Sequence, residues 1–114
     1  MDRAGVKRFC LSLPAATLDH PFGEDHDAYR VGGKMFAIRG GAGDLSFKVS
    51  DIAYEVLTDT GRAAPAPYLA RAKWVNLADP ADWSGDDLKD HLITAHALIA
   101  ARLTKKARKH LGLA

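Results

Sequence analysis

The chain has 114 residues, of which 47% are hydrophobic and 26% charged, a composition typical of one globular domain and not of a disordered chain. Sixteen Lys and Arg residues against fourteen Asp and Glu residues leave a formal charge of only +2, so bulk charge does not by itself indicate a polyanionic partner. The single cysteine, Cys10, excludes an intrachain disulfide framework and a CxxC metal site.

The N-terminal stretch gives no targeting signal. Lys7 and Arg8 interrupt its apolar pattern, and no segment of the chain is apolar over the length of a signal peptide or of a membrane span. We therefore expect a cytoplasmic protein that makes no membrane contact.

A helix is predicted from Asp2 to Leu13. Val6, Phe9, Cys10 and Leu13 recur at the spacing of one helical face, and Pro14 ends the pattern. Because Cys10 lies on this apolar face, we expect it to be a small buried side chain and not a reactive thiol.

The middle of the chain changes to a period of two, which is typical of half-buried strands. The alternation covers residues 27–31, 34–39 and 44–49. Gly32 and Gly33 predict a tight hairpin between the first two strands, and "GGAG" at residues 40–43 predicts a longer turn. The pairing is therefore expected to be antiparallel.

The second half predicts a short helix, a loop, one more strand and a long helix. Ser50 is a good N-cap for a helix over residues 51–60, whereas Pro65 and Pro67 forbid a helix and a central strand. A strand is expected at about residues 72–77. Ser84 then caps the longest helix, whose apolar stripe is Leu88, Leu92, Ala95, Ile99 and Leu103.

These elements predict the α+β class, with one antiparallel sheet, helices packed on one face and a single domain over residues 1–114 with a basic tail from about residue 104. The other face is expected to meet water or a partner. The strand alternation points Arg30, Arg39 and Lys48 to that face and places on the helix face Tyr29, Phe36, Ile38 and Phe47.

The stretch "HPFGEDHD", His20 to Asp27, is the part of the chain that most resembles a site of chemistry. Its two histidines and its carboxylates offer nitrogen and oxygen ligands, but a metal needs three or four of them to converge. Pro21, Gly23 and Asp25 are typical turn residues. We therefore interpret the stretch as a turn and predict no metal, no cofactor, no catalytic residue and no enzymatic activity.

Three segments carry a resemblance to a known family. "LSLPAATLDHPFGEDHDAYRVGGKMFA", "LSFKVS" and "PAPYLARAKWVNL", in this order, are similar to the MmcQ/YjbR family of small bacterial proteins. The resemblance implies a frataxin-like (CyaY-like) α-β-α fold, also described as a double-wing arrangement, and a DNA-binding role. It implies no established enzymatic chemistry at these positions.

The first functional hypothesis is a non-enzymatic DNA-binding module that contacts phosphates through basic residues. Two points are left open. Trp74 either stacks on a base or belongs to the core. The cations of the tail either bind a polyanion or only stabilise the C-terminus of a helix. The residues assigned to this hypothesis are Arg30, Arg39, Lys48, Arg71, Lys73, Trp74, Lys105, Lys106, Arg108 and Lys109.

The alternative hypothesis is a small-molecule or protein-interaction module. Its pocket would be formed by the segments His20–Asp27 and Pro67–Trp74, with the basic residues recognising an acidic group of the partner. The two hypotheses differ in salt dependence, because contacts with phosphates weaken steeply as salt is added. The oligomeric state is left open.

Overall fold

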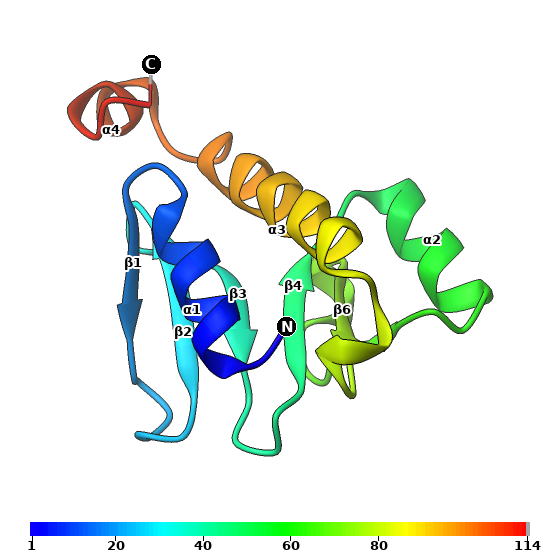
Figure 1. Ribbon diagram of the computed structural model, residues 1–114. Coiled ribbons are helices and arrows are strands. Elements are labelled where there is room, and N and C mark those ends of the chain that lie inside the picture. Colours follow the sequence, from blue (N-terminus) through cyan, green and yellow to red (C-terminus); the bar gives the residue numbers. More distant parts are fainter. Residues whose placement is uncertain (114) are drawn as a thin grey trace.

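The computed structural model describes residues 1–113 and has helices, strands and two short 3₁₀ turns (Figure 1). The helices are α1 (Arg3–Ser12), α2 (Asp51–Asp59), α3 (Gly85–Ala100) and α4 (Lys105–His110). The 3₁₀ turns are η1 (Ala70–Ala72) and η2 (Pro80–Asp82). The strands are β1 (Ala16–Asp19), β2 (Asp27–Val31), β3 (Lys34–Arg39), β4 (Leu45–Lys48), β5 (Ala64–Pro65) and β6 (Trp74–Leu77).

All six strands form one antiparallel sheet in the order β1-β2-β3-β4-β6-β5. The predicted α+β class and the antiparallel pairing are confirmed. Gly32 and Gly33 both have positive φ, at 57° and 79°, as the predicted tight hairpin between β2 and β3 requires.

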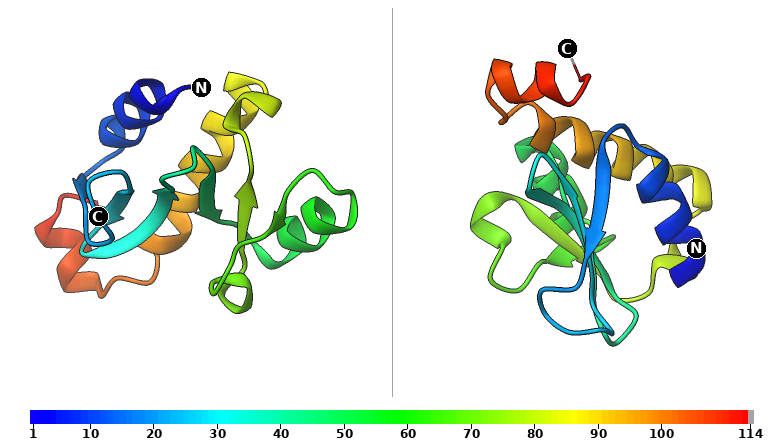
Figure 2. Two further views of the ribbon diagram at one scale, coloured as in Figure 1. Left: turned by 90° about the horizontal axis from the view of Figure 1, so that it is seen from below. Right: turned by 90° about the vertical axis from the view of Figure 1, so that its left-hand side faces the viewer.

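Helices α1 and α3 pack against one face of the sheet, and the core lies between them and the strands. Helix α3 crosses β2, β3 and β4, α1 packs on β1, and α2 lies beside β5 and β6 at the far side (Figure 1). The other face, called here the open face, carries no α-helix of residues 1–113 across its centre. The right-hand view in Figure 2 shows α1 on one side of the sheet and the segment before β6 on the other.

A β-bulge in β3 overturns part of the predicted face assignment. Tyr29 pairs with Ala37 and Arg30 with Met35, so Phe36 is an extra residue in β3. Phe36 and Ala37 are both fully buried. Beyond the bulge the alternation is therefore reversed: Ile38 lies on the open face, opposite Ser46, and Arg39 lies on the helix face, opposite Leu45.

Two strands were not predicted. β1 is a four-residue edge strand whose side chains alternate between half-buried and exposed, and so short a pattern cannot be distinguished from a loop in the sequence. β5 contains Pro65 but lies at the other edge, where a residue without a backbone N–H is tolerated.

The long helix ends earlier than predicted. α3 stops at Ala100, because Thr104 adopts an extended backbone and caps a separate short helix, α4, by accepting a hydrogen bond from Ala107 N at 3.0 Å. Leu103 is still buried, as its place in the apolar stripe predicts. The predicted caps of α2 and α3 are confirmed: Ser50 accepts from Ala53 N and Ser84 from Asp87 N, each at 3.1 Å.

In the described part of the chain, no helix has the length and apolar character that crossing a membrane requires.

Candidate binding sites

The His20–Asp27 stretch is the connection between β1 and β2. Gly23 N donates to His20 O at 3.3 Å and His26 N donates to Gly23 O at 3.1 Å, with Gly23 at a φ of 117°. These successive backbone bonds make it a pair of tight turns, and glycine permits the positive φ between them. The turn interpretation is confirmed.

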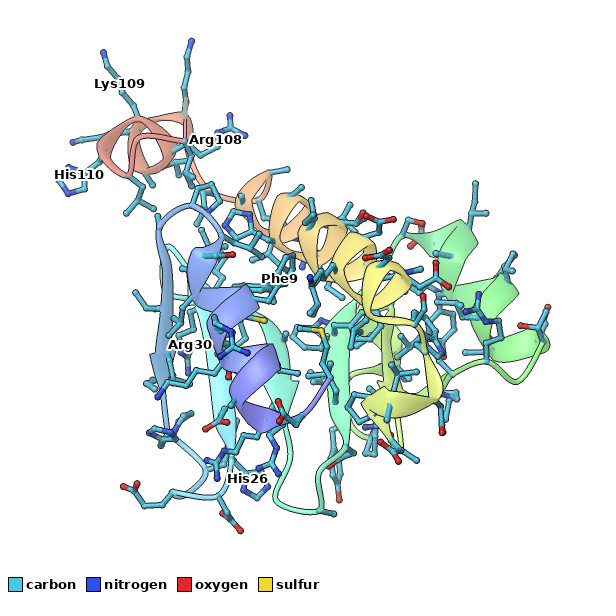
Figure 3. The ribbon with its side chains drawn as sticks, viewed as in Figure 1. Phe9, His26, Arg30, Arg108, Lys109 and His110 are labelled. Carbon is cyan, nitrogen blue, oxygen red and sulfur yellow. The ribbon has the colours of Figure 1, made fainter. Side chains whose placement is uncertain are left out.

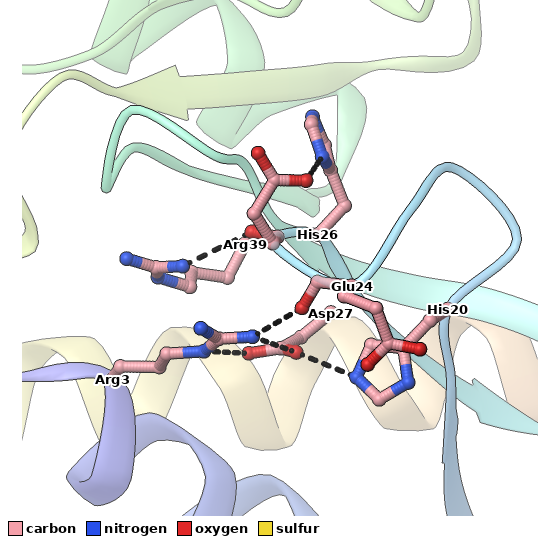
Figure 4. A network of polar contacts seen from close by, with 7 residues as sticks. Arg3, His20, Glu24, His26, Asp27 and Arg39 are labelled. Atoms are coloured by element: carbon pink, nitrogen blue, oxygen red, sulfur yellow. Dashed lines mark hydrogen bonds and ion pairs between the residues drawn. The ribbon is translucent and has the colours of Figure 1, made fainter.

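Asp27 lies at the centre of a polar network beside the start of α1 (Figure 4). Its carboxylate is 2% exposed and accepts two hydrogen bonds from Arg3, from Nε and Nη2, each at 2.9 Å. His20 Nε2 lies 3.0 Å from Asp27 Oδ1, and Arg3 Nη2 also donates to Glu24 O at 2.9 Å. The Arg3 guanidinium holds the pKa of Asp27 below its usual range, so this network fastens the start of α1 to the turn.

The second histidine of the stretch makes a different contact. His26 Nδ1 lies 2.9 Å from Asp25 Oδ1, and Asp25 rather than Asp27 is its partner. Within residues 1–113, no group of three or more His, Cys, Asp or Glu side chains is arranged to hold a metal ion. The absence of a bound metal stays a prediction, which metal analysis of the purified protein tests directly.

A depression of about 700 Å³ lies on the open face, called here the open-face depression. Three segments line it: the β1–β2 turn, the β3–β4 turn and the loop before η1. The structure thus brings parts of His20–Asp27 and Pro67–Trp74 together, as the alternative hypothesis predicts. The expected basic residues are wrong for this depression, because no Lys or Arg of residues 1–113 lines it. Its lining side chains include Phe22, Asp25, His26, Ile38, Asp44 and Tyr68.

All three strand cations assigned to DNA contact are held by local partners. Arg30 lies on the open face as predicted, but its Nε donates to Asp19 Oδ1 at 2.9 Å and its Nη1 to Gly33 O at 3.0 Å. Arg39 was predicted on the same face, and this is wrong because of the bulge. It lies on the helix face and donates to Asp25 O at 3.2 Å.

Lys48 is the third strand cation, and its ammonium points at a neighbouring loop. It lies on the open face as predicted, where Nζ donates to Ala72 O. Partial burial lowers the pKa of Lys48, and the nearby Arg102 guanidinium acts in the same direction. A lysine held in this way has little freedom to reach a phosphate.

The predicted contact residues at the start of β6 and in the segment before it have different surroundings in the structure. Trp74 is only 4% exposed, so the base-stacking alternative is wrong for the folded chain. Lys73 Nζ lies 4.8 Å from the centre of the Tyr54 ring, a cation–π contact, and Arg71 is exposed. Arg71 is thus the member of this segment whose charge is open to solvent.

The four tail cations form a separate basic surface on α4. Leu103, which directly precedes α4, packs closely against Gly32 of the β2–β3 hairpin: a Cβ added to Gly32 would lie only 2.6 Å from Leu103 Cδ1. This contact anchors the start of the surface. Lys34 follows that hairpin directly and Arg102 precedes Leu103. We call this surface the basic end and define it by Lys34, Arg102, Lys105, Lys106, Arg108 and Lys109. Figure 3 shows Arg108 and Lys109 at the opposite end of the molecule from His26.

Cys10 is fully buried on α1, as predicted. Burial raises the pKa of its thiol to about 12, so the thiolate needed for nucleophilic attack is suppressed at neutral pH.

The YjbR family model matches residues 11–98, which is most of the chain and includes both turns and the loop that line the depression. The chain belongs to the YjbR family. A crystal structure of Deinococcus radiodurans protein DR2400, described as a DUF419 domain, is similar with a TM-score of 0.84. It shares 25% sequence identity, and the match covers 96% of this chain and 86% of that chain. No curated protein matches this YjbR chain significantly.

Sequence reasoning missed the residues that complete these sites. Phe22 is 56% exposed and Tyr68 fully exposed, and the only signal for either is an aromatic residue inside a Pro- and Gly-rich turn. Arg3, Lys34 and Arg102 also carry no motif. Arg3 meets Asp27, and the hairpin beside Lys34 meets Leu103, only in the folded chain.

Proposed function

We propose that this YjbR protein is a small non-enzymatic binding protein of the cytoplasm whose basic end contacts the phosphates of DNA. The observation that carries the proposal is that six cations gather there without forming an ion pair to a side chain of residues 1–113. None of the six cations of the basic end has a side-chain carboxylate of residues 1–113 within 4.0 Å. A cytoplasmic location agrees with a single buried thiol and no disulfide.

Cations without a carboxylate partner on one short helix suit phosphate recognition, although Arg108 also donates to Ala101 O at 3.5 Å. Lys and Arg that neutralise phosphates release condensed counterions from the nucleic acid, which favours binding to any sequence. Four of the six cations lie within the six-residue α4. Arg108 and Lys109 lie in the last turn of α4, where cations stabilise the C-terminus of a helix, so their presence alone does not demonstrate a partner. Lys105 and Lys106 lie in the first turn, where the helix dipole gives a cation no such benefit.

The sheet face is not the contact surface in this proposal. Arg30 and Lys48 already bond to groups of the protein, Arg39 lies on the helix face and Trp74 is buried. We therefore assign the contact to phosphates at the basic end and expect little discrimination between DNA sequences, because phosphates carry no sequence information.

A DNA titration at several salt concentrations tests this function. For the parent chain, the logarithm of the binding constant should fall linearly with the logarithm of the salt concentration. Changing Lys105, Lys106, Arg108 and Lys109 together to Gln should flatten the slope by roughly 0.9 for each phosphate that the variant no longer neutralises. The matched control changes four exposed cations elsewhere, Lys7, Arg8, Arg62 and Lys89, to Gln and alters net charge equally.

The proposal fails if the parent binds no DNA at low salt, or if the α4 variant and the control variant are weakened to the same extent. Either result would favour the alternative, a small-molecule or protein-interaction module that uses the open-face depression. Circular dichroism of both variants shows whether α4 and the fold are retained.

A further inference from the structure

We propose that the open-face depression is a second, independent binding site, and that its ligand is a small organic cation with an aromatic body. Nothing in the DNA-binding proposal requires this site, since it lies at the other end of the molecule from the basic end (Figure 3).

The depression has the size and the apolar surface for a small aromatic molecule. Its volume of about 700 Å³ is within the usual range of ligand pockets, roughly 300–1,000 Å³. Ile38 reaches it because the bulge turns this residue to the open face. The Phe22 ring packs edge-on to the His26 ring, with their centres 6.4 Å apart, and is 56% exposed. Large aromatic side chains exposed beside a concave surface are typical of recognition sites.

The charge of the lining selects a cation. The lining contains two carboxylates, Asp25 and Asp44, and no Lys or Arg of residues 1–113, although the whole chain is net positive. Asp25 Oδ1 is next to His26 Nδ1, and Asp44 Oδ2 accepts from Asn76 Nδ2 at 2.8 Å. The second oxygen of each carboxylate has no hydrogen-bond donor in the described part of the chain, so both can accept from an ammonium group.

Aromatic rings add to this preference, because the faces of Phe and Tyr attract cations. Asp25 is also kept ionised, because the contact with His26 lowers its pKa. Carboxylates together with exposed rings recognise an organic ammonium better than a neutral or anionic molecule.

Tyr68 is held in an unusual backbone conformation at this site. Its φ is 65°, in the left-handed region that bulky residues rarely adopt, and its side chain is fully exposed. The surrounding loop is fixed by backbone bonds, from Leu69 N to Ala66 O at 3.2 Å and from Trp74 N to Leu69 O at 3.3 Å. The fixed loop thus holds the exposed Tyr68 ring beside the depression that this residue lines.

Three probes of similar shape and different charge test the site. Tryptamine is cationic, indole is neutral and indole-3-acetate is anionic. Each is titrated into the full ¹⁵N-labelled chain, and amide shifts give both the affinity and the residues affected. We expect tryptamine to shift residues 22–26, 40–46 and 67–69, and to bind about tenfold or more tightly than indole-3-acetate.

Variants then assign the contacts. Tyr68→Ala and Asp44→Asn should each weaken tryptamine binding by about threefold or more, on the scale of one cation–π or one partly exposed charge contact. Asp25→Asn serves as a second carboxylate variant whose side chain is too exposed to affect folding. The control is Ile52→Ala, an exposed apolar residue on α2, which should leave the affinity unchanged.

The proposal is overturned if tryptamine produces no shifts at these residues at millimolar concentration, if all three probes bind equally, or if the carboxylate variants bind tryptamine as the parent does. A single-stranded oligonucleotide that shifts these residues, where tryptamine does not, would also overturn it. DNA binding at the basic end can fail or succeed without changing any of these outcomes.

Discussion

Asp27 shows what a single buried carboxylate contributes to this fold. It joins α1, through Arg3, to the end of β1, through His20. The aspartate side chain is almost inaccessible, so removing its charge leaves the Arg3 guanidinium without its bidentate partner.

We predict that Asp27→Asn lowers the free energy of unfolding at neutral pH by about 1–3 kcal/mol. The pKa of Asp27 is lower in the folded chain than the unfolded value of about 3.9, so its contribution is fully present above that value and is lost as the pH falls through the folded pKa. Urea denaturation of parent and variant over an acid pH series should show the difference between them shrinking toward zero.

Asp25→Asn is the matched control for this comparison. Asp25 is the neighbouring histidine-paired carboxylate, but its side chain is 72% exposed, and exposed pairs contribute little to stability. An equal loss of stability in both variants would contradict the structural role assigned to Asp27.

A substitution at Trp74 distinguishes a role in the core from a role in binding. Because it is buried, we predict that Trp74→Ala costs about 3–5 kcal/mol of stability. The midpoint of urea denaturation, followed by far-ultraviolet circular dichroism, measures this. A variant with an unchanged midpoint and weakened binding to single-stranded DNA would instead restore the stacking interpretation.

At the scale of elements, patterns contained within one segment were predictable. The amphipathic stripes of α1 and α3, the N-caps Ser50 and Ser84 and the Gly32-Gly33 hairpin all follow from residues close in sequence. The bulge at Phe36 was not predictable, because "KMFAIR" alternates equally well in either register and only pairing with β2 shows the extra residue. This one extra residue explains why the sheet faces predicted for Ile38 and Arg39 were wrong.

The hairpin between β2 and β3 also supports α4, since Gly32 lies against Leu103. We predict that Gly32→Ala is more destabilising than Gly33→Ala. Both substitutions strain a positive φ, at a cost of roughly 1 kcal/mol, but only a Cβ at Gly32 would collide with Leu103, whereas nothing lies within 4 Å at Gly33.

Thermal denaturation gives the order of stability, and hydrogen exchange of residues 105–110 shows whether α4 loosens in Gly32→Ala alone. Equal melting temperatures and equal exchange would mean that the hairpin does not hold the basic end in place.

At the scale of the whole molecule, the two candidate sites differ in how far the sequence could predict them. Most of the basic end could be predicted from a single segment, because Arg102 and the four cations of α4 lie within eight consecutive residues. The open-face depression requires three distant segments and the reversed face of β3. Its two main segments could be named from their turn composition, but the rings and carboxylates that characterise it become a group only through the fold.

Charge is segregated along the molecule, and we propose on this basis that DNA meets the protein at the basic end and not at the sheet face. The most direct test is to map amide shifts of the ¹⁵N-labelled chain at low salt as a short DNA duplex is added. We predict shifts at Lys34 and residues 102–110 that disappear as salt is raised, with residues 22–26 and 67–69 unmoved. Shifts centred on the open face at Arg30, Ile38 and Ser46, or no shifts anywhere at low salt, would contradict it.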